Sequence, residues 1–330
     1  MEFLRQRTVS CRQAGVLLVL TSCLLALITV NQRMFGTTSQ QESASGGARE
    51  IVVNPIYATS DGERRRCAAG KSRLLPQCVI VGFPKCGTFA LLKMLDLHPD
   101  VMARIAHPFE VNFFNSHWRR GLDWYRRMMR CSSPGQVSLE KSPSYVYDGD
   151  VPARIKAMND SVRLLIMVKD PFVRTVSSYL QDVSRGRSTK TFEETVAGNN
   201  SGGVNPDSLN VRQSLYYNYL LPWYATFRSE QIHIVDGDRL VTDPVSEVRQ
   251  IETFLRLAHK ITEDSLVYNE AKGFYCMKKG SANQTKHVCM GEGKGRPHPD
   301  VDFVIEKNLK TLFWPYNEKL YKLVGRRFNW

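Results

Sequence analysis

An apolar run that passes directly into a glycine-containing turn and then a helix constrains the fold more than any other feature of the sequence. The run QCVIVG at 77–82 predicts a buried strand, and the stretch at 88–97 predicts a helix. Short apolar runs go on alternating with longer amphipathic stretches, which is typical of an α/β domain with a parallel sheet. The later strands are predicted at 163–168 and 231–235, and the later helices at 171–181, 244–257 and 305–324.

The chain is long enough for one such domain with a substantial core. Of its 330 residues, 42% are hydrophobic, so a single large domain is the economical prediction. We expect an α/β domain over 77–330 with a central parallel sheet flanked by helices. Ligands of such a sheet bind at the carboxyl ends of its strands.

The turn after the first strand is suited to binding an anion. Gly82, Lys85, Gly87 and Thr88 occupy it. Glycines let backbone N–H groups approach an anion, the helix adds its positive N-terminal end, and Lys85 adds an ammonium. It is not a Walker A loop, because that motif places Lys directly before Ser or Thr and here Gly87 stands there. A P-loop kinase is therefore disfavoured, and an ordinary glycine-containing turn is the alternative.

A second strand end carries similar residues. The segment VKDPFVRTVSSYLQ places Lys169, Arg174 and Ser177 where the second strand meets a helix, which Asp170 can cap and Pro171 can start. Arg174 and Ser177 lie three residues apart, so both could contact one phosphate. Two such strand ends suit a ligand with two separated phosphate groups. The alternative is an exposed helix that carries these residues for solubility.

The N-terminal region predicts a membrane anchor. The run at 14–30 carries no charge and is just long enough to span a bilayer as a helix. More positive charge precedes the run than follows it, so we expect a cytoplasmic tail at 1–13 and a lumenal remainder. A flexible stem is expected at 31–76, which is rich in Ser, Gln, Gly and Arg. A cleaved signal peptide is the competing interpretation.

Lumenal placement would allow disulfides to persist. Cys276 and Cys289 flank a short polar segment, which predicts a disulfide-closed loop. Zinc binding competes, but neither cysteine has the neighbouring ligands that zinc requires, and we expect no metal. Glycosylation sequons stand at Asn159, Asn199 and Asn283. The pairing of four further cysteines stays open: Cys67, Cys78, Cys86 and Cys131.

The net charge of +13 favours anionic partners, among which nucleic acid, anionic lipid and sulfated polysaccharide all qualify. One basic cluster is interleaved with aromatic residues, which suits a sulfated glycan, although a solvated basic helix is the alternative. Its members are Trp118, Arg119, Arg120, Trp124, Tyr125, Arg126, Arg127 and Arg130.

The motifs resemble those of a known family. The turn GFPKCGT resembles the 5′-phosphosulfate loop of sulfotransferases that use the donor nucleotide PAPS, and VKDPFVRTVSSY resembles their 3′-phosphate motif. Further segments resemble the heparan sulfate glucosamine 3-O-sulfotransferases, over nearly all of 77–330. They are ALLKMLDLHPDV, EVNFFN, LEKSPSYV, RLLIMVKDP, IHIVDGDRL, KGFYC, KGRPHP and LVGRRFNW.

The resemblance implies a single P-loop-like sulfotransferase domain that transfers a sulfonate from PAPS to a hydroxyl of heparan sulfate, namely the 3-hydroxyl of glucosamine. It implies that Lys85 stabilises charge on the departing nucleotide, and that Lys169 and Ser177 hold the 3′-phosphate. The family usually has Arg where this chain has Lys169, which keeps the charge but loses the bidentate fork. The remaining donor-binding residues implied are Cys86, Gly87, Thr88, Phe89, Lys294, Gly295 and Arg296.

On the acceptor side, Glu110 matches the family's catalytic carboxylate, which takes the proton of the acceptor hydroxyl. Lys141 would lie near the sulfonate or the glycan. Asn112 and Asn115 stand where the family commonly has His and Asp, and they can still hydrogen-bond sugar hydroxyls. Phe89 replaces a basic residue of the donor loop.

These departures leave two alternatives open. The first is a sulfotransferase that acts on an N-sulfation site or on another glycan. The second is a catalytically silent glycan-binding homologue, against which the retention of Lys85 and Glu110 argues. The resemblance also implies a single-pass type II protein of the Golgi membrane with its catalytic domain in the lumen, and no nucleic-acid partner.

Overall fold

The computed structural model describes residues 66–198, 203–279, 286–291 and 295–330. The predicted membrane segment at 14–30 and most of the predicted stem lie outside these residues. Within them, no helix combines the length and the apolar character that crossing a membrane requires.

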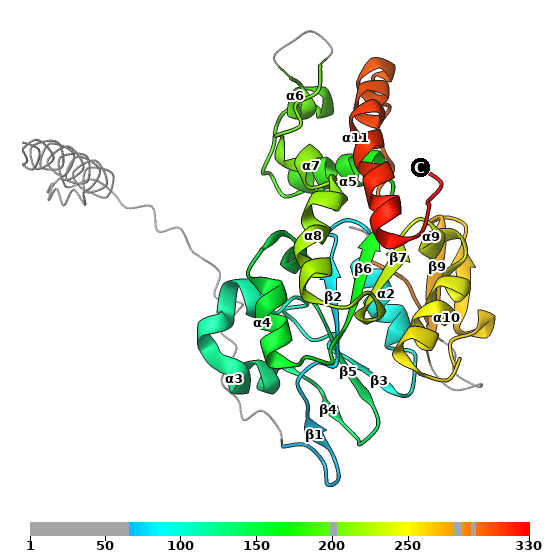
Figure 1. The fold of residues 1–330 in the computed structure, drawn as a ribbon. Helices are drawn as coiled ribbons and strands as arrows, with labels where there is room; N and C mark the ends of the chain where they lie inside the picture. Colours follow the sequence, from blue (N-terminus) through cyan, green and yellow to red (C-terminus); the bar gives the residue numbers. More distant parts are fainter. Residues whose placement is uncertain (1–65, 199–202, 280–285, 292–294) are drawn as a thin grey trace, which may run out of the picture. The chain divides into compact units, whose positions relative to one another are not determined.

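A five-stranded sheet with the strand order β3-β5-β2-β6-β7 forms the centre of the domain. All neighbouring pairs in it are parallel, as the alternation of strands and helices predicted, and helices flank the sheet in Figure 1. The strands are β2 (Cys78–Gly82), β3 (Val101–Ala103), β5 (Val137–Lys141), β6 (Arg163–Val168) and β7 (Ile232–Asp236).

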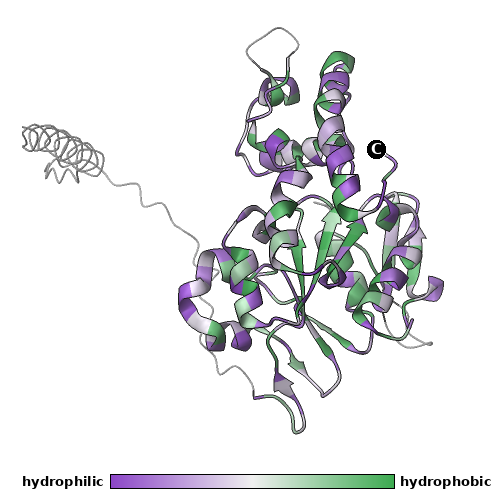
Figure 2. Cartoon of the chain, viewed as in Figure 1, coloured by the Kyte–Doolittle hydropathy of each residue, from purple (hydrophilic) through white to green (hydrophobic). Residues whose placement is uncertain are grey.

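Strands β2 and β6 are inner strands of this sheet and consist almost wholly of buried residues. Every residue of β2 is buried, and in β6 all but Arg163 are buried. Strands covered on both faces lack polar alternation, and both strands are largely green in Figure 2.

The helices include the four that the sequence predicted. These are α2 (Thr88–Leu95), α5 (Pro171–Ser184), α10 (Pro244–Leu255) and α11 (Phe303–Val324). The further helices are α3 (Gly121–Met128), α4 (Val151–Met158), α6 (Phe192–Val196), α7 (Leu209–Arg212), α8 (Tyr216–Thr226) and α9 (Arg239–Thr242). Single turns form the π-helix η1 (Phe113–His117) and the 3₁₀ helices η2 (Trp118–Arg120), η3 (Pro143–Tyr147), η4 (Ser229–Gln231) and η5 (Glu263–Ser265).

Helix α5 begins as its sequence predicts. The Asp170 carboxylate accepts hydrogen bonds from the N–H groups of Phe172 and Val173, and Pro171 occupies the first turn. A carboxylate at this position satisfies amides that have no partner inside the helix. The cap therefore fixes the direction in which the chain leaves β6.

Two small antiparallel sheets carry the disulfides. The Cys276–Cys289 disulfide is confirmed, and it joins β9 (Phe274–Lys279) to the residue after β10 (Lys286–Val288). Together with β8 (Leu266–Asn269) these strands form a three-stranded sheet.

The second disulfide joins Cys67 to Cys131, which the sequence left unassigned. It lies beside the pairing of β1 (Ser72–Arg73) with β4 (Cys131–Ser132). Strand β1 therefore stands upstream of residue 77, where the sequence predicted the domain to begin. Cys78 and Cys86 are buried free thiols.

Candidate functional site

Three lysines lie at the carboxyl ends of neighbouring strands in the central sheet. Lys85 follows β2, Lys141 ends β5, and Lys169 follows β6. Since β5 and β6 flank β2 in parallel, with Ile80 opposite Lys141, the chain leaves all three strands at the same edge. The strand pattern predicted the arrangement of Lys85 and Lys169. Lys141, which the family resemblance implied, ends a strand that the pattern did not predict.

The loop between β2 and α2 is compact. The N–H of Cys86 donates to the carbonyl of Phe83 at 3.2 Å, and the N–H of Phe83 donates to the carbonyl of Met167 at 2.8 Å. Gly87 has a φ of 99°, a left-handed conformation that side chains disfavour. It precedes α2 without a side-chain cap, so the first amides of α2, beginning at Thr88, provide donors suited to an anion.

The thiol of Cys86 points into the core and not into this loop. Its Sγ lies 3.6 Å from the hydroxyl of Tyr216, and burial raises the pKa of this thiol to about 11. Only the backbone of Cys86 can line the anion loop, and its N–H is already bonded within the turn. Thr88 is buried at the start of α2.

Lys85 reaches across to α5. Its ammonium donates to the side-chain oxygen of Gln181 at 2.7 Å. Gln181 lies one helical turn beyond Ser177, so these two side chains share a face of α5. The hydroxyl of Ser177 lies 3.2 Å from Nε2 of His298. The structure thus brings together Lys85 and Ser177, and it adds Gln181 and His298, which sequence reasoning missed.

Arg174 does not take part in anion binding, so its predicted sharing of a phosphate with Ser177 is wrong. The side chain is fully buried beneath the chain segment that joins α7 to α8. Its guanidinium donates to the carbonyls of Asn210 and Pro84. Three side-chain acceptors complete its partners: Ser178, Gln213 and Ser214. Because Pro84 belongs to the loop after β2, the hydrogen bond from Arg174 helps to hold that loop in place.

The end of β7 packs against the same loop. A Cβ added at Gly237 would lie 2.5 Å from the carbonyl oxygen of Cys86, so only glycine permits this approach. The next residue, Asp238, places Oδ1 3.6 Å from the ammonium of Lys169 and accepts the N–H of Asp170 at Oδ2. Burial raises the pKa of Asp238.

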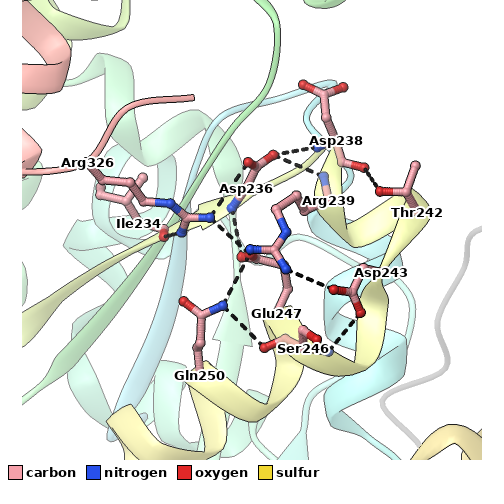
Figure 3. Close-up of polar contacts among 10 residues, drawn as sticks. All are labelled: Ile234, Asp236, Asp238, Arg239, Thr242, Asp243, Ser246, Glu247, Gln250 and Arg326. Atoms are coloured by element: carbon pink, nitrogen blue, oxygen red, sulfur yellow. Dashed lines mark hydrogen bonds and ion pairs between the residues drawn. The ribbon is translucent and has the colours of Figure 1, made fainter. Parts of the chain in front are cut away.

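A buried network holds this turn in place (Figure 3). The carboxylate of Asp236 accepts the N–H groups of Asp238 and Arg239, both at 3.0 Å. Arg326, from the C-terminal segment, lies 3.0 Å from an oxygen of Glu247 and 3.7 Å from Asp236. The C-terminal segment therefore helps to fix the position of Asp238, and through it Lys169.

Glu110 and Lys141 form an ion pair. Their Oε1 and Nζ atoms are 2.6 Å apart, and the Lys141 side chain is 2% exposed while that of Glu110 is 42% exposed. An accessible carboxylate thus stands beside an ammonium that is almost wholly buried. Phe89 adds its ring to this group, 5.5 Å from the Lys141 ammonium.

Asn112 and Asn115 converge on Ser144, close in sequence to Lys141. The Ser144 hydroxyl donates to Oδ1 of Asn112 at 2.9 Å and accepts from Nδ2 of Asn115 at 3.1 Å. The two amides, which the sequence assigned to the acceptor, therefore belong to one hydrogen-bonded group that follows Glu110.

A second carboxyl group, Glu140, lies behind this segment. It accepts from the hydroxyls of Tyr125 and Ser142 and from the N–H of Val111 at 3.5 Å. Burial raises its pKa. Glu140 is enclosed and fully hydrogen-bonded, so it supports the backbone next to Glu110 and is not available to a ligand.

The predicted basic cluster is partly neutralised. Arg126 pairs with Asp123, and Arg130 pairs with Asp96. Arg120 stacks on Trp124 at 5.0 Å. The cluster is therefore a mixed surface around α3, and its role in glycan binding stays a prediction.

The structure describes some of the remaining predicted residues and leaves others undescribed. Arg296 is half-buried, Gly295 is exposed in backbone but closely approached by the Phe274 ring, and Asn159 follows α4. Within the residues that the structure describes, no group of three metal-ligating side chains occurs. The predicted residues that the structure does not describe are Lys294, Asn199 and Asn283.

Comparison with known proteins gives consistent matches. The family model described as "Sulfotransferase domain" matches residues 75–301. Human heparan sulfate glucosamine 3-O-sulfotransferase 5 is 40% identical over 308 residues, which cover 88% of this chain and 87% of that protein. Mouse heparan sulfate glucosamine 3-O-sulfotransferase 3B1 is 39% identical, covering 78% of this chain and 66% of that protein.

A solved structure supports the fold. The crystal structure of a sulfotransferase from Alicyclobacillus acidocaldarius has a TM-score of 0.56 at 20% identity, and the match covers 77% of this chain and 98% of that one.

Proposed function

Because the chain belongs to the heparan sulfate glucosamine 3-O-sulfotransferases of the sulfotransferase family, we propose that it transfers a sulfonate from PAPS to the 3-hydroxyl of glucosamine in heparan sulfate. One observation carries the proposal. At a single edge of the sheet, the accessible carboxylate of Glu110 stands 2.6 Å from the ammonium of Lys141, beside an uncapped helix start and two further lysines.

The donor would lie along this edge with its two charged ends apart. The amides at the start of α2 and the ammonium of Lys85 suit the phosphosulfate, and Lys169 with Ser177 suits the 3′-phosphate. Lys85 donates to Gln181, which lies one turn from Ser177 on α5. This contact brings the proposed phosphosulfate and 3′-phosphate groups of residues close together, which suits a nucleotide with an anionic group at each of two positions. The stretch that contains Gly295 and Arg296 would close over the donor.

The reaction is an in-line displacement at sulfur. Glu110 takes the proton of the acceptor hydroxyl while that oxygen forms a bond to sulfur, and the bond from sulfur to the nucleotide phosphate breaks. Negative charge then grows on the departing phosphate, where Lys85 and the α2 amides stabilise it. Lys141 keeps positive charge beside both the carboxylate and the transferred group.

We also propose that this domain works in the lumen of the Golgi apparatus, anchored by the segment at 14–30 as a type II protein. Two disulfides, Cys67–Cys131 and Cys276–Cys289, support an oxidising compartment. The charge distribution around the apolar segment supports this orientation.

Transfer of labelled sulfate from PAPS to defined heparan oligosaccharides, followed by disaccharide mapping, tests the proposal. We expect label on the 3-hydroxyl of glucosamine. Label on nitrogen or another hydroxyl would instead support the rival acceptor that Asn112 and Asn115 keep open. Glycan binding without any transfer would support a silent homologue.

A further inference from the structure

We propose that Phe109, braced by Phe89, is a platform on which a pyranose ring of the acceptor glycan stacks beside Glu110. This inference rests on the proposed function, because it assigns part of the acceptor site of that enzyme. It concerns two residues of this chain to which no acceptor role has been assigned above.

Phe109 is an exposed aromatic residue held in a defined place. It remains 42% exposed, although its ring centre lies 4.9 Å from that of Phe89 and 5.7 Å from that of His107. Both contacts have edge-to-face geometry, which aromatic pairs prefer. Two neighbouring rings therefore hold Phe109 in place while 42% of the residue stays exposed to a ligand.

The platform adjoins the reacting groups. Phe89 is in the first turn of α2, directly after the predicted phosphosulfate loop. Its ring centre is 5.5 Å from the ammonium of Lys141, which itself lies 2.6 Å from the carboxylate of Glu110. Phe89 thus connects the donor loop, the ion pair and Phe109.

The segment that carries Phe109 is anchored from behind. Arg104 is 2% exposed, and its guanidinium donates to the carbonyls of Ala106 and Pro108 and to that of Met128 at 2.9 Å. A ring held in this way loses little conformational freedom when a ligand covers it, and such preorganisation favours binding.

The chemistry of a pyranose fits this surface. A sugar ring has faces made of C–H groups and an edge of hydroxyls, so its C–H face can cover Phe109 while a hydroxyl turns towards Glu110. This contact buries apolar surface and involves no pairing of charges. It should therefore resist salt, which screens contacts between lysine or arginine and the sulfates of the glycan.

Steady-state kinetics of Phe109→Ala with a heparan oligosaccharide test the platform. We expect the KM for the glycan to rise about five- to tenfold, with the Kd for PAP, the desulfated donor, unchanged. The rise should be the same at low and high salt, and Phe109→Tyr should restore the parent KM. Trp314→Ala removes a ring that is 65% exposed on α11 and serves as the matched control without effect.

Three outcomes would overturn the platform: an unchanged glycan KM in Phe109→Ala, a parallel loss of PAP affinity, or a KM effect that vanishes at high salt. The parent enzyme, measured alongside, separates this failure from that of the proposed function. An active parent with an unaffected Phe109→Ala removes only the platform, whereas a parent that transfers no sulfate removes the enzyme assignment itself.

Discussion

The ammonium of Lys141 lies 2.6 Å from the carboxylate of Glu110, at the end of strand β5. The lysine is nearly enclosed and the glutamate is accessible, so the pair presents its carboxylate to solvent and keeps its cation in the protein. A buried ammonium is stable only with such a partner. We therefore infer that Lys141 supplies positive charge beside Glu110 at the proposed acceptor site.

Lys141→Met tests that role. Without the ammonium, Glu110 loses its partner and the transferred sulfonate loses nearby positive charge. We expect kcat to fall by about 10²-fold with the Kd for PAP within about twofold, since the proposed donor site assigns its phosphates to Lys85, Lys169 and the α2 amides. Equal kcat values for variant and parent would remove Lys141 from the reaction.

Lys85→Ala should weaken both donor affinity and rate. Lys85 is placed where it would contact the phosphosulfate in the bound state and the leaving phosphate in the transition state, so we expect kcat to fall about 10²-fold or more and the Kd for PAP to rise. Calorimetry and initial rates measure the two effects. Unchanged kinetics in Lys85→Ala would contradict the anion loop.

Substitutions of Arg174 and Ser177 should have different effects, although both residues are on α5. One should change stability and the other PAP binding. Arg174→Met leaves several buried acceptors without donors, so we expect it to lower the free energy of unfolding by about 3 kcal/mol. Ser177→Ala should leave the Tm unchanged and raise the Kd for PAP. Thermal melts with and without PAP distinguish them. A stable Arg174→Met protein with weakened PAP binding would instead restore the arginine as a phosphate ligand.

Stability should depend on the protonation of His233 in β7. Burial, with a smaller contribution from Arg326, lowers the pKa of His233 to about 4, so below about pH 6.5 the unfolded chain binds a proton that the folded chain does not. The stabilisation present at neutral pH is therefore lost as the pH falls towards 4.

Denaturant titrations should show a loss of about 2 kcal/mol from this group between about pH 7 and 5. His233→Leu should have a shallower pH dependence over this range than the parent. Parallel curves for the parent and His233→Leu would show that His233 does not contribute.

Much of the fold could be predicted from the sequence because β2, β6 and β7 are apolar runs, and α5 carries its own Asp170–Pro171 start signal. Strand β5 could not, because it contains the buried Glu140 and Lys141, whose charges are compensated by residues distant in sequence.

The same limit applies within the site. Periodicity placed Arg174 beside Ser177, but it could not show that the α7–α8 segment covers that side of α5 and supplies acceptors at Asn210 and Ser214. The Cys67–Cys131 disulfide spans a sequence separation of 64, and its pairing follows from tertiary structure alone. Motif resemblance, by contrast, identified Lys85, Glu110 and Lys141, which the structure places at one edge.

The most direct test of the central claim is sulfate transfer from PAPS to a heparan oligosaccharide by the full chain and by Glu110→Gln under identical conditions. The amide cannot accept the proton but fills the same space, so we expect the parent to transfer sulfate to the glucosamine 3-hydroxyl and the variant to be slower by about 10³-fold, with equal Kd values for PAP. A variant that transfers sulfate within a few-fold of the parent rate would contradict the account.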